Sequence, residues 1–206
     1  MHEAKPKRIL AFGAHPDDVE WGMGGTLIKM RNAGCELFIA DLTVGDKSAT
    51  GTPQERFIEA QNAARQLGTR RLVLNLGDKK LQVDGATSAI ILEIIRQVQP
   101  DLIYAPHWDD RHPDHTVCSE LLRPYASAFY VLKGSVEPTH AVDISDVIEE
   151  KKRILWQHSS QVRTYWEANF HRKHERAGKE IGAKFAEAFV VNDRLAFAKQ
   201  ELPEML

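Results

Sequence analysis

Two short motifs rich in histidine and aspartate contain the residues best suited to chemistry. The first reads Ala-His-Pro-Asp-Asp over residues 14–18, and the second reads His-Pro-Asp-His over residues 112–115. Each places two potential ligands three positions apart, a spacing that brings side chains to one side of a helical turn. The proline between them suits the entry to a helix because its φ is fixed.

These residues are sufficient for a catalytic metal site. His15, Asp18 and one of the two histidines His112 and His115 supply three ligands, which leaves a fourth position for water, as is typical of catalytic zinc. The remaining histidine and the other two aspartates can then act on the reaction. A carboxylate can take a proton from water, an imidazolium can face developing negative charge, and a second carboxylate can orient that imidazole.

Each motif has a simpler explanation when it is taken alone. An aspartate beside a proline at a helix start often only caps the helix, and a histidine at a strand end often only bonds backbone carbonyls. Because both motifs follow strands of the same predicted sheet, together they favour one shared metal site.

Other potential ligands carry weaker signals. Cys35 and Cys118 are too few and too far apart in sequence for a structural metal site or a disulfide framework. His171 and His174 are spaced like a metal pair, but charged neighbours surround them, so we expect them on a solvated helix face.

The elements that must position the motifs alternate in type along the first two thirds of the chain. Hydrophobic patterning predicts strands over residues 8–12, 36–43, 71–76 and 101–105, and helices over about 18–33, 53–67 and 89–98 with another after residue 113. This alternation predicts an α/β fold with a Rossmann-like, mostly parallel sheet and helices on both faces. Ligands of such sheets bind beyond the carboxyl ends of the strands, where both motifs lie.

Several boundaries have specific signals. Thr52 and Glu55 form a predicted capping box with Pro53 at the first helical position, and Gly68 ends that helix. The glycines in residues 22–25 lack a phosphate-loop ending and so predict close helix packing.

In the last third we expect strands over 129–132 and 141–144, a helix over 146–158 capped by Ser145, and a charged helix over 166–179. We expect residues 1–206 to form a single domain.

Composition excludes several classes of protein. The 206 residues are 43% hydrophobic, and 27 basic residues nearly balance 29 acidic ones. This balance provides no general field for nucleic acid or an anionic membrane. No run approaches the roughly 20 apolar residues of a membrane span, and the first eight residues lack a signal-peptide core. We therefore expect a cytoplasmic enzyme or binding domain.

The chain resembles the LmbE-like family, also called the PIG-L family, of zinc-dependent N-deacetylases that act on N-acetylglucosamine conjugates. The resemblance runs from Arg8 to about Val190 and rests on residues 15–26, 41–43, 51–52, 56, 110–115, 178–182 and 186–187. It is greatest for the branch resembling the bacillithiol-pathway deacetylase, which acts on glucosaminyl malate. It implies a small-molecule amino-sugar substrate and a homo-oligomer, since family members often form hexamers.

The resemblance also implies roles for individual residues. Zinc would be held by His15, Asp18 and His115, and Fe²⁺ is an alternative ion for the same ligands. Asp17 would act as general base and then as general acid. His112 would stabilise the tetrahedral oxyanion as a cation.

Three further residues take supporting roles by resemblance. Asp114 would pair with His112. Arg56 and Arg111 match positions that line the substrate pocket, and their guanidinium groups suit bidentate contacts with a carboxylate. A surface or interface salt bridge is the alternative for each arginine.

One position departs from the family pattern. Related enzymes commonly have a tyrosine where this chain has Phe185. Without that hydroxyl, either zinc and His112 suffice or another group such as Tyr165 or Tyr130 replaces it. The departure leaves two other functions open. One is an amidase for another thiol–sugar or antibiotic-type conjugate, and the other is a non-catalytic protein that binds a metal or small molecule.

Overall fold

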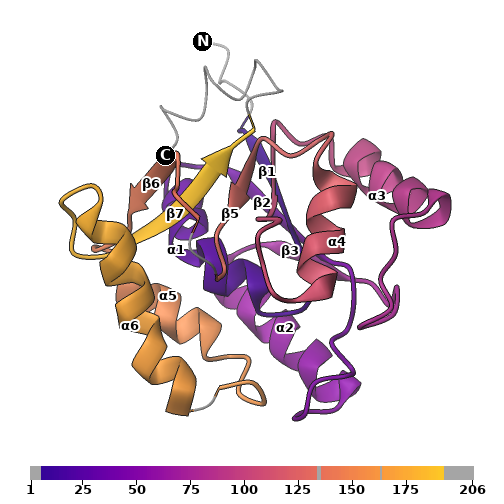
Figure 1. Cartoon of the computed structure of the whole chain (residues 1–206), viewed down its shortest axis with the longest axis horizontal. Coiled ribbons are helices and arrows are strands. Elements are labelled where there is room, and N and C mark those ends of the chain that lie inside the picture. Colours follow the sequence, from indigo (N-terminus) through magenta and orange to yellow (C-terminus); the bar gives the residue numbers. More distant parts are fainter. Residues whose placement is uncertain (1–5, 134–135, 163, 193–206) are drawn as a thin grey trace.

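The structure is a computed structural model that describes residues 6–133, 136–162 and 164–192, without the side chains of residues 164 and 165. The described chain forms one sheet of seven strands in the order β3-β2-β1-β4-β5-β7-β6 (Figure 1). The strands are β1 (Arg8–Gly13), β2 (Glu36–Asp41), β3 (Arg70–Val73), β4 (Leu102–Pro106), β5 (Ala128–Tyr130), β6 (His140–Asp143) and β7 (Ala186–Val191).

Five neighbouring strands run parallel and one strand runs against them. Strands β3, β2, β1, β4 and β5 pair in parallel, whereas β7 is antiparallel to both β5 and β6. Residues Ile9–Ala11 of β1 pair with Leu102–Tyr104 of β4, so these two strands end side by side. The predicted mostly parallel sheet is confirmed.

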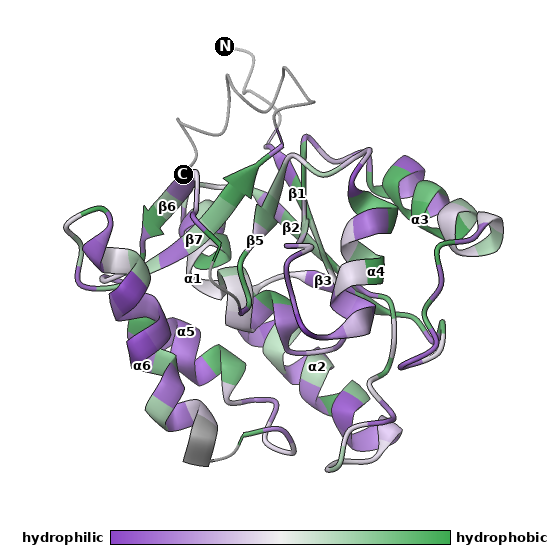
Figure 2. Ribbon diagram, viewed as in Figure 1, coloured by the Kyte–Doolittle hydropathy of each residue, from purple (hydrophilic) through white to green (hydrophobic). Residues whose placement is uncertain are grey.

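Helices cover both faces of this sheet, as predicted. They are α1 (Asp18–Asn32), α2 (Pro53–Leu67), α3 (Gly85–Val98), α4 (Pro113–Leu122), α5 (Ile148–Leu155) and α6 (Thr164–Lys179). One core cluster joins Ile9 and Ala11 of β1 to α1, α2, α5 and α6, and the other joins Leu10 and Phe12 to α3 and α4. Side chains alternate between the faces along β1 because successive residues of a strand point in opposite directions. Figure 2 shows hydrophobic strands at the centre and hydrophilic segments along the outer helices.

Local signals placed some boundaries correctly and missed others. The Thr52–Glu55 capping box is present, and Gly68 ends α2 in the left-handed conformation. Helix α3 begins four residues earlier than the pattern predicts, because Asp84 accepts a hydrogen bond from the backbone of Thr87 and caps it. Strand β3 ends at Val73, before the predicted end at residue 76.

One expectation for the last third was wrong, and one strand was missed. Ser145 does not cap a helix: its hydroxyl donates to the carbonyl of Phe185 and accepts from the amide of Phe185, and α5 begins only at Ile148. Strand β7 had not been predicted. It inserts between β5 and β6, so its place depends on distant pairing.

Helix α1 is interrupted near its middle, where the glycines predicted to pack closely do so. Met23 has non-helical φ and ψ values, and a Cβ on Gly22 would collide with the ring of Tyr130. The backbone amides of Gly25 and Thr26 donate to the carboxylate of Glu187 in β7 at 2.8 and 2.6 Å. Glu187 therefore caps the second half of α1. Among the described helices, none is long and apolar enough to cross a membrane.

Candidate active site

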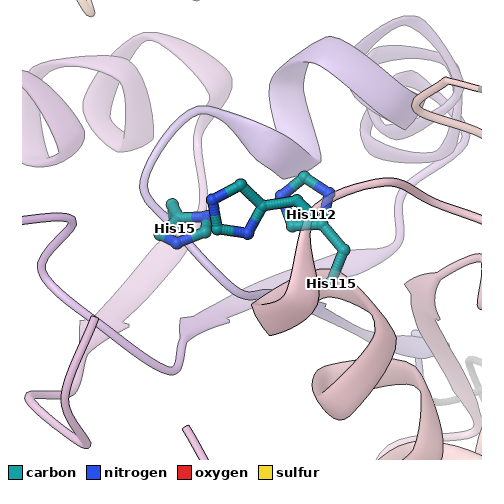
Figure 3. Close-up of side chains that lie close together, drawn as sticks. All are labelled: His15, His112 and His115. Carbon is teal, nitrogen blue, oxygen red and sulfur yellow. The ribbon is translucent and has the colours of Figure 1, made fainter. Parts of the chain in front are cut away.

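The two motifs meet at the carboxyl ends of β1 and β4. His15 follows the end of β1, while His112 caps the N-terminus of α4 and His115 lies in its first turn. The three imidazole rings gather in one place (Figure 3), with ring centroids 4.6 Å apart for His15 and His112 and 5.3 Å apart for His15 and His115. Segments about a hundred positions apart therefore build one site.

Asp18 lies between the two histidines that were predicted to share a metal with it. One oxygen of its carboxylate is 3.4 Å from Nδ1 of His15, and the other is 3.1 Å from Nε2 of His115. Tetrahedral zinc with ligands at about 2.0–2.1 Å has ligand atoms about 3.3 Å apart. Each of the two distances is close to that separation, although they involve different oxygens of Asp18.

Two groups of described residues have ligand atoms close enough to share one ion, and the predicted set of His15, Asp18 and His115 is not one of them. The atoms of His15, His112 and His115 lie within 4.8 Å of one another, and so do those of His15, Asp78 and Asp114. His15 is thus common to every candidate set and is nearly buried, with 7% of its surface exposed.

The other face of His15 contacts two carboxylates. Its Nε2 atom lies 3.2 Å from Oδ1 of Asp78 and 3.2 Å from Oδ2 of Asp114. The carboxylate of Asp114 thus bonds His15. Its backbone amide donates to Nδ1 of His112, and its charge opposes the fall in the pKa of His112. Sequence reasoning missed Asp78, which lies in a polar loop without a periodic pattern.

Electrostatics favour protonated imidazoles beside these acids. Burial lowers the pKa of His15, but its hydrogen bonds, above all with Asp114, outweigh that and hold the pKa well above its usual value. At His115, burial is again opposed, and the charges of Asp18 and Asp110 raise the pKa to about 9. A metal that binds these nitrogens must therefore displace protons.

Asp17 stands apart from the ligand set. Its backbone has φ 111° and ψ −26°, a left-handed conformation that is rare for a residue with a side chain. Burial raises the pKa of its carboxyl to about 6, although the charge of Arg56 opposes this rise. Strained residues of this kind cluster at functional sites, and a carboxylate near this pKa suits general base catalysis.

Arg56 holds this strained turn in place. Its guanidinium donates to the carbonyls of Gly45 and Pro16 at 2.8 and 2.6 Å and lies 3.4 Å from Oδ2 of Asp17. The arginine is buried and faces the site as predicted, but its measured contacts are with the protein itself. It therefore orients Asp17.

His112 is half-buried beside both other rings. It stacks on His115 with centroids 4.7 Å apart. Burial, followed by the charges of His15 and His115, lowers the pKa of His112. The resemblance implies that His112 acts as a cation. It could do so only if the neighbouring rings of His15 and His115 were neutral, and a bound metal would keep them neutral.

A cavity of about 320 Å³ opens above these residues. Its floor contains His15, Asp17, Asp18, His112 and His115, and its lining also includes the tryptophans Trp21 and Trp166 and the lysines Lys47, Lys79 and Lys133. Arg111 is exposed and does not line this cavity, so the structure does not support its predicted place in the pocket.

The departure at Phe185 has a different meaning in the structure. Phe185 is buried in the core and does not line the cavity, so a hydroxyl there would not face the site. The hydroxyl of Tyr130 donates to the carbonyl of Phe12 in the interior, which excludes it as a substitute. The side chain of Tyr165 lies outside the described residues.

The expectation for His174 was also wrong. This residue is fully buried, its Nδ1 donates to the carbonyl of Phe170, and its Nε2 lies 2.6 Å from Nζ of Lys151. Its neighbours in sequence are charged, but His174 itself lies on the face of α6 that packs against the core. Only His171 is partly exposed, as a solvated face requires.

Comparisons with known proteins agree with this architecture. Residues 10–126 match the family model described as PIG-L, GlcNAc-PI de-N-acetylase. The chain is 27% identical to the diacetylchitobiose deacetylase of Thermococcus kodakarensis over 88% of this chain and 81% of that protein. It is 26% identical to a probable N-acetyl-α-D-glucosaminyl L-malate deacetylase of Bacillus subtilis over 76% of this chain and 84% of that protein.

A solved structure is similar along nearly the whole length. The crystal structure of a conserved protein from Thermus thermophilus superposes with a TM-score of 0.81 at 30% identity, covering 88% of this chain and 93% of that one. The family model alone covers more than half of the chain. The resemblance inferred from the two motifs is confirmed, and the protein belongs to the PIG-L family.

Proposed function

We propose that this protein is a metal-dependent N-deacetylase that hydrolyses the acetamide of an N-acetylglucosamine-type conjugate. One observation carries the proposal: Asp17 lies on a cavity floor beside three potential ligands, while its own carboxylate has a pKa raised to about 6. Relatives that cover most of the chain are named as deacetylases of acetylated amino sugars, which supports the same reaction here.

The donor set fits a zinc ion. Two imidazole nitrogens and one carboxylate, from His15, His115 and Asp18, would hold it, and Fe²⁺ suits the same atoms. When bound, zinc polarises a carbonyl and makes a water molecule acidic enough to act as a nucleophile near neutral pH.

The residues of the chain would then move the protons. Asp17 accepts the proton of the attacking water and passes it to the departing amine, so one carboxyl serves both halves of the reaction. Arg56 keeps this carboxyl in place through its contacts with Pro16 and Gly45. His112 faces the oxygen on which negative charge develops.

The cavity walls support a sugar with a negatively charged attachment. Trp21 and Trp166 lie with ring centroids 5.1 Å apart and offer apolar surface to a sugar ring. Lys47, Lys79 and Lys133 add positive charge to the lining, which favours an anionic group such as the malate of glucosaminyl malate over a second neutral sugar.

An acetate-release assay tests both parts of the proposal. Protein stripped of metal with a chelator and reloaded with zinc would be given N-acetylglucosaminyl malate, N-acetylglucosamine and diacetylchitobiose. We expect release only after reloading, and fastest release from the malate conjugate. No release from any of them despite full zinc loading would instead support a non-catalytic binding protein.

Two lysine variants test the choice of substrate. Lys79→Gln removes a charge from the cavity lining, whereas Lys80→Gln removes one from the next residue, which does not line it. We expect Lys79→Gln to raise KM for the malate conjugate up to about fivefold and Lys80→Gln to leave it unchanged. Equal KM values for both variants would contradict the anionic attachment.

A further inference from the structure

Two buried carboxylates meet one nitrogen of His15. Oδ1 of Asp78 and Oδ2 of Asp114 both lie 3.2 Å from Nε2, while Nδ1 on the other side of the ring faces Asp18. Asp78 and Asp114 are only 4% and 2% exposed. The ring is thus held between a ligand on one side and a pair of acids on the other.

Backbone amides fix both acids. The amide of Lys47 donates to Oδ2 of Asp78 at 2.6 Å, and the amide of Lys79 donates to Oδ2 of Asp114 at 2.7 Å. Asp78 therefore uses one oxygen to hold the loop that follows β2 and keeps the other for His15. This division fixes its orientation before any ligand binds.

We propose that Asp78 is a positioning residue which, with Asp114, holds the proton of His15 on Nε2. A neutral imidazole carries one N–H, so a proton held on Nε2 leaves the Nδ1 lone pair for a metal. Carboxylates that bond the outer nitrogen of a ligating histidine orient the ring and strengthen its binding. This inference rests on the proposed function only in taking His15 as a metal ligand.

The same atoms offer one alternative. His15, Asp78 and Asp114 are close enough to bind an ion themselves, which would make the acids ligands of a second metal. The oxygen of Asp114 that faces His15 already accepts the amide of Lys79, which favours the positioning role. Zinc stoichiometry separates the two: positioning requires one ion per chain at this site, and two ions would overturn it.

A matched pair of variants measures the effect of Asp78. Asp78→Ala removes the contact with His15, whereas Asp84→Ala also removes a carboxylate that accepts a backbone amide, at 2.7 Å from Thr87, but lies outside the cavity lining. Zinc affinity would be measured on the full chain by competition with a chromophoric chelator. We expect Asp78→Ala to weaken it about 10- to 100-fold and Asp84→Ala to change it less than about twofold.

A milder variant and a spectroscopic measurement keep the test decisive if Asp78→Ala unfolds. Asp78→Asn retains one acceptor, so we expect a smaller loss of zinc affinity than in Asp78→Ala. NMR of the His15 ring nitrogens should show the proton on Nε2 in the zinc-loaded protein. A proton on Nδ1, or wild-type zinc affinity in folded Asp78→Asn and Asp78→Ala, would overturn the proposal.

These readouts are independent of hydrolysis. If no acetylated sugar were cleaved while the Asp78 variants still lost zinc, the proposed function would fail and the positioning role would stand. If acetate were released and the variants bound zinc normally, the reverse would hold.

Discussion

Two groups of buried charges meet at the first turn of α1 and behave differently. On one side Asp18 contacts His15 and His115 beneath the cavity. On the other, Glu20 pairs with Arg71 and lies 3.1 Å from Nε2 of His158. The two acids are two positions apart, so they point to nearly opposite faces of the helix.

The interior group is enclosed, and one guanidinium pairs with two of its carboxylates. The guanidinium of Arg71 also bonds Asp41 at 2.6 Å, and these side chains have essentially no exposed surface. Burial raises the pKa of Glu20, but the charge of Arg71 outweighs it and holds that pKa well below its usual value. Burial raises the pKa of Asp41, and the charge of Arg71 opposes that rise.

The charges at the cavity are less strongly paired. Asp17 keeps 15% of its side chain exposed, contacts Arg56 only weakly, and has a pKa raised to about 6. The difference teaches that strong pairing with Arg71 keeps the pKa of Glu20 low, whereas the weak contact with Arg56 leaves burial to raise the pKa of Asp17. The same helical turn thus serves structure on one side and chemistry on the other.

The largest effect is expected from the cavity side. Asp17→Asn keeps the size of the side chain but removes the proton acceptor, so we expect turnover to fall about 10²- to 10⁴-fold with zinc content unchanged. Acetate release and metal analysis of the same sample check this. Full turnover in the zinc-loaded variant would remove Asp17 from the mechanism.

A substitution in the interior group should lower the stability of the protein. Arg71→Met leaves two buried carboxylates without a cation, and we expect the free energy of unfolding to fall by about 3–5 kcal/mol in urea denaturation. Arg96→Met, which breaks the exposed pair with Glu93, is the control and should change it by less than about 1 kcal/mol. Similar losses in both variants would contradict the comparison.

Zinc binding should depend on pH through the cavity histidines. His115 has a pKa raised to about 9, and zinc must displace that proton. Apparent zinc affinity should therefore rise by up to about tenfold per pH unit below about pH 9 for each proton displaced. Without zinc, the stabilisation due to protonated His115 is complete below about pH 6.5 and is lost as the pH rises through about 9.

Chelator competition at pH 7, 8 and 9 measures the zinc affinity, and urea unfolding of zinc-free protein measures the stability. An affinity that does not change between pH 7 and 9 would show that His115 binds zinc without losing a proton.

The smallest effect concerns the strained backbone at Asp17. Both Asp17→Gly and Asp17→Ala remove the carboxylate, but only glycine adopts φ 111° without strain. We expect the glycine variant to be more stable by about 1–2 kcal/mol in urea unfolding. The same pair of changes at Asp146, where φ is not positive, should not favour glycine.

Much of the fold could be predicted from the sequence because it depends on local sequence patterns. The parallel strands, the capping box at Thr52 and the turns that hold the two motifs follow from short patterns of hydrophobic, glycine and proline residues. Strand β7 could not be predicted in this way, because its place depends on pairing with β5 and β6, which come earlier in the chain.

The candidate site could likewise be predicted only where its residues lie in local motifs. Its two motifs revealed His15, Asp17, Asp18 and His115, since each motif follows a strand at the same sheet edge. Asp78 was missed because its partner is 63 positions away and nothing in its loop marks it. The homo-oligomeric state and cytoplasmic location implied earlier stay predictions.

Helix α1, which supports the site, depends on Glu187, a residue that is synthesised much later. Residues 15–26 leave the ribosome about 160 positions before Glu187, which caps the second half of α1. Until then, the amides of Gly25 and Thr26 lack this carboxylate as an acceptor. The helix that begins with Asp18 is therefore finished by nearly the last strand to be translated, and a chain released too early would have both motifs but an incompletely capped support beneath them.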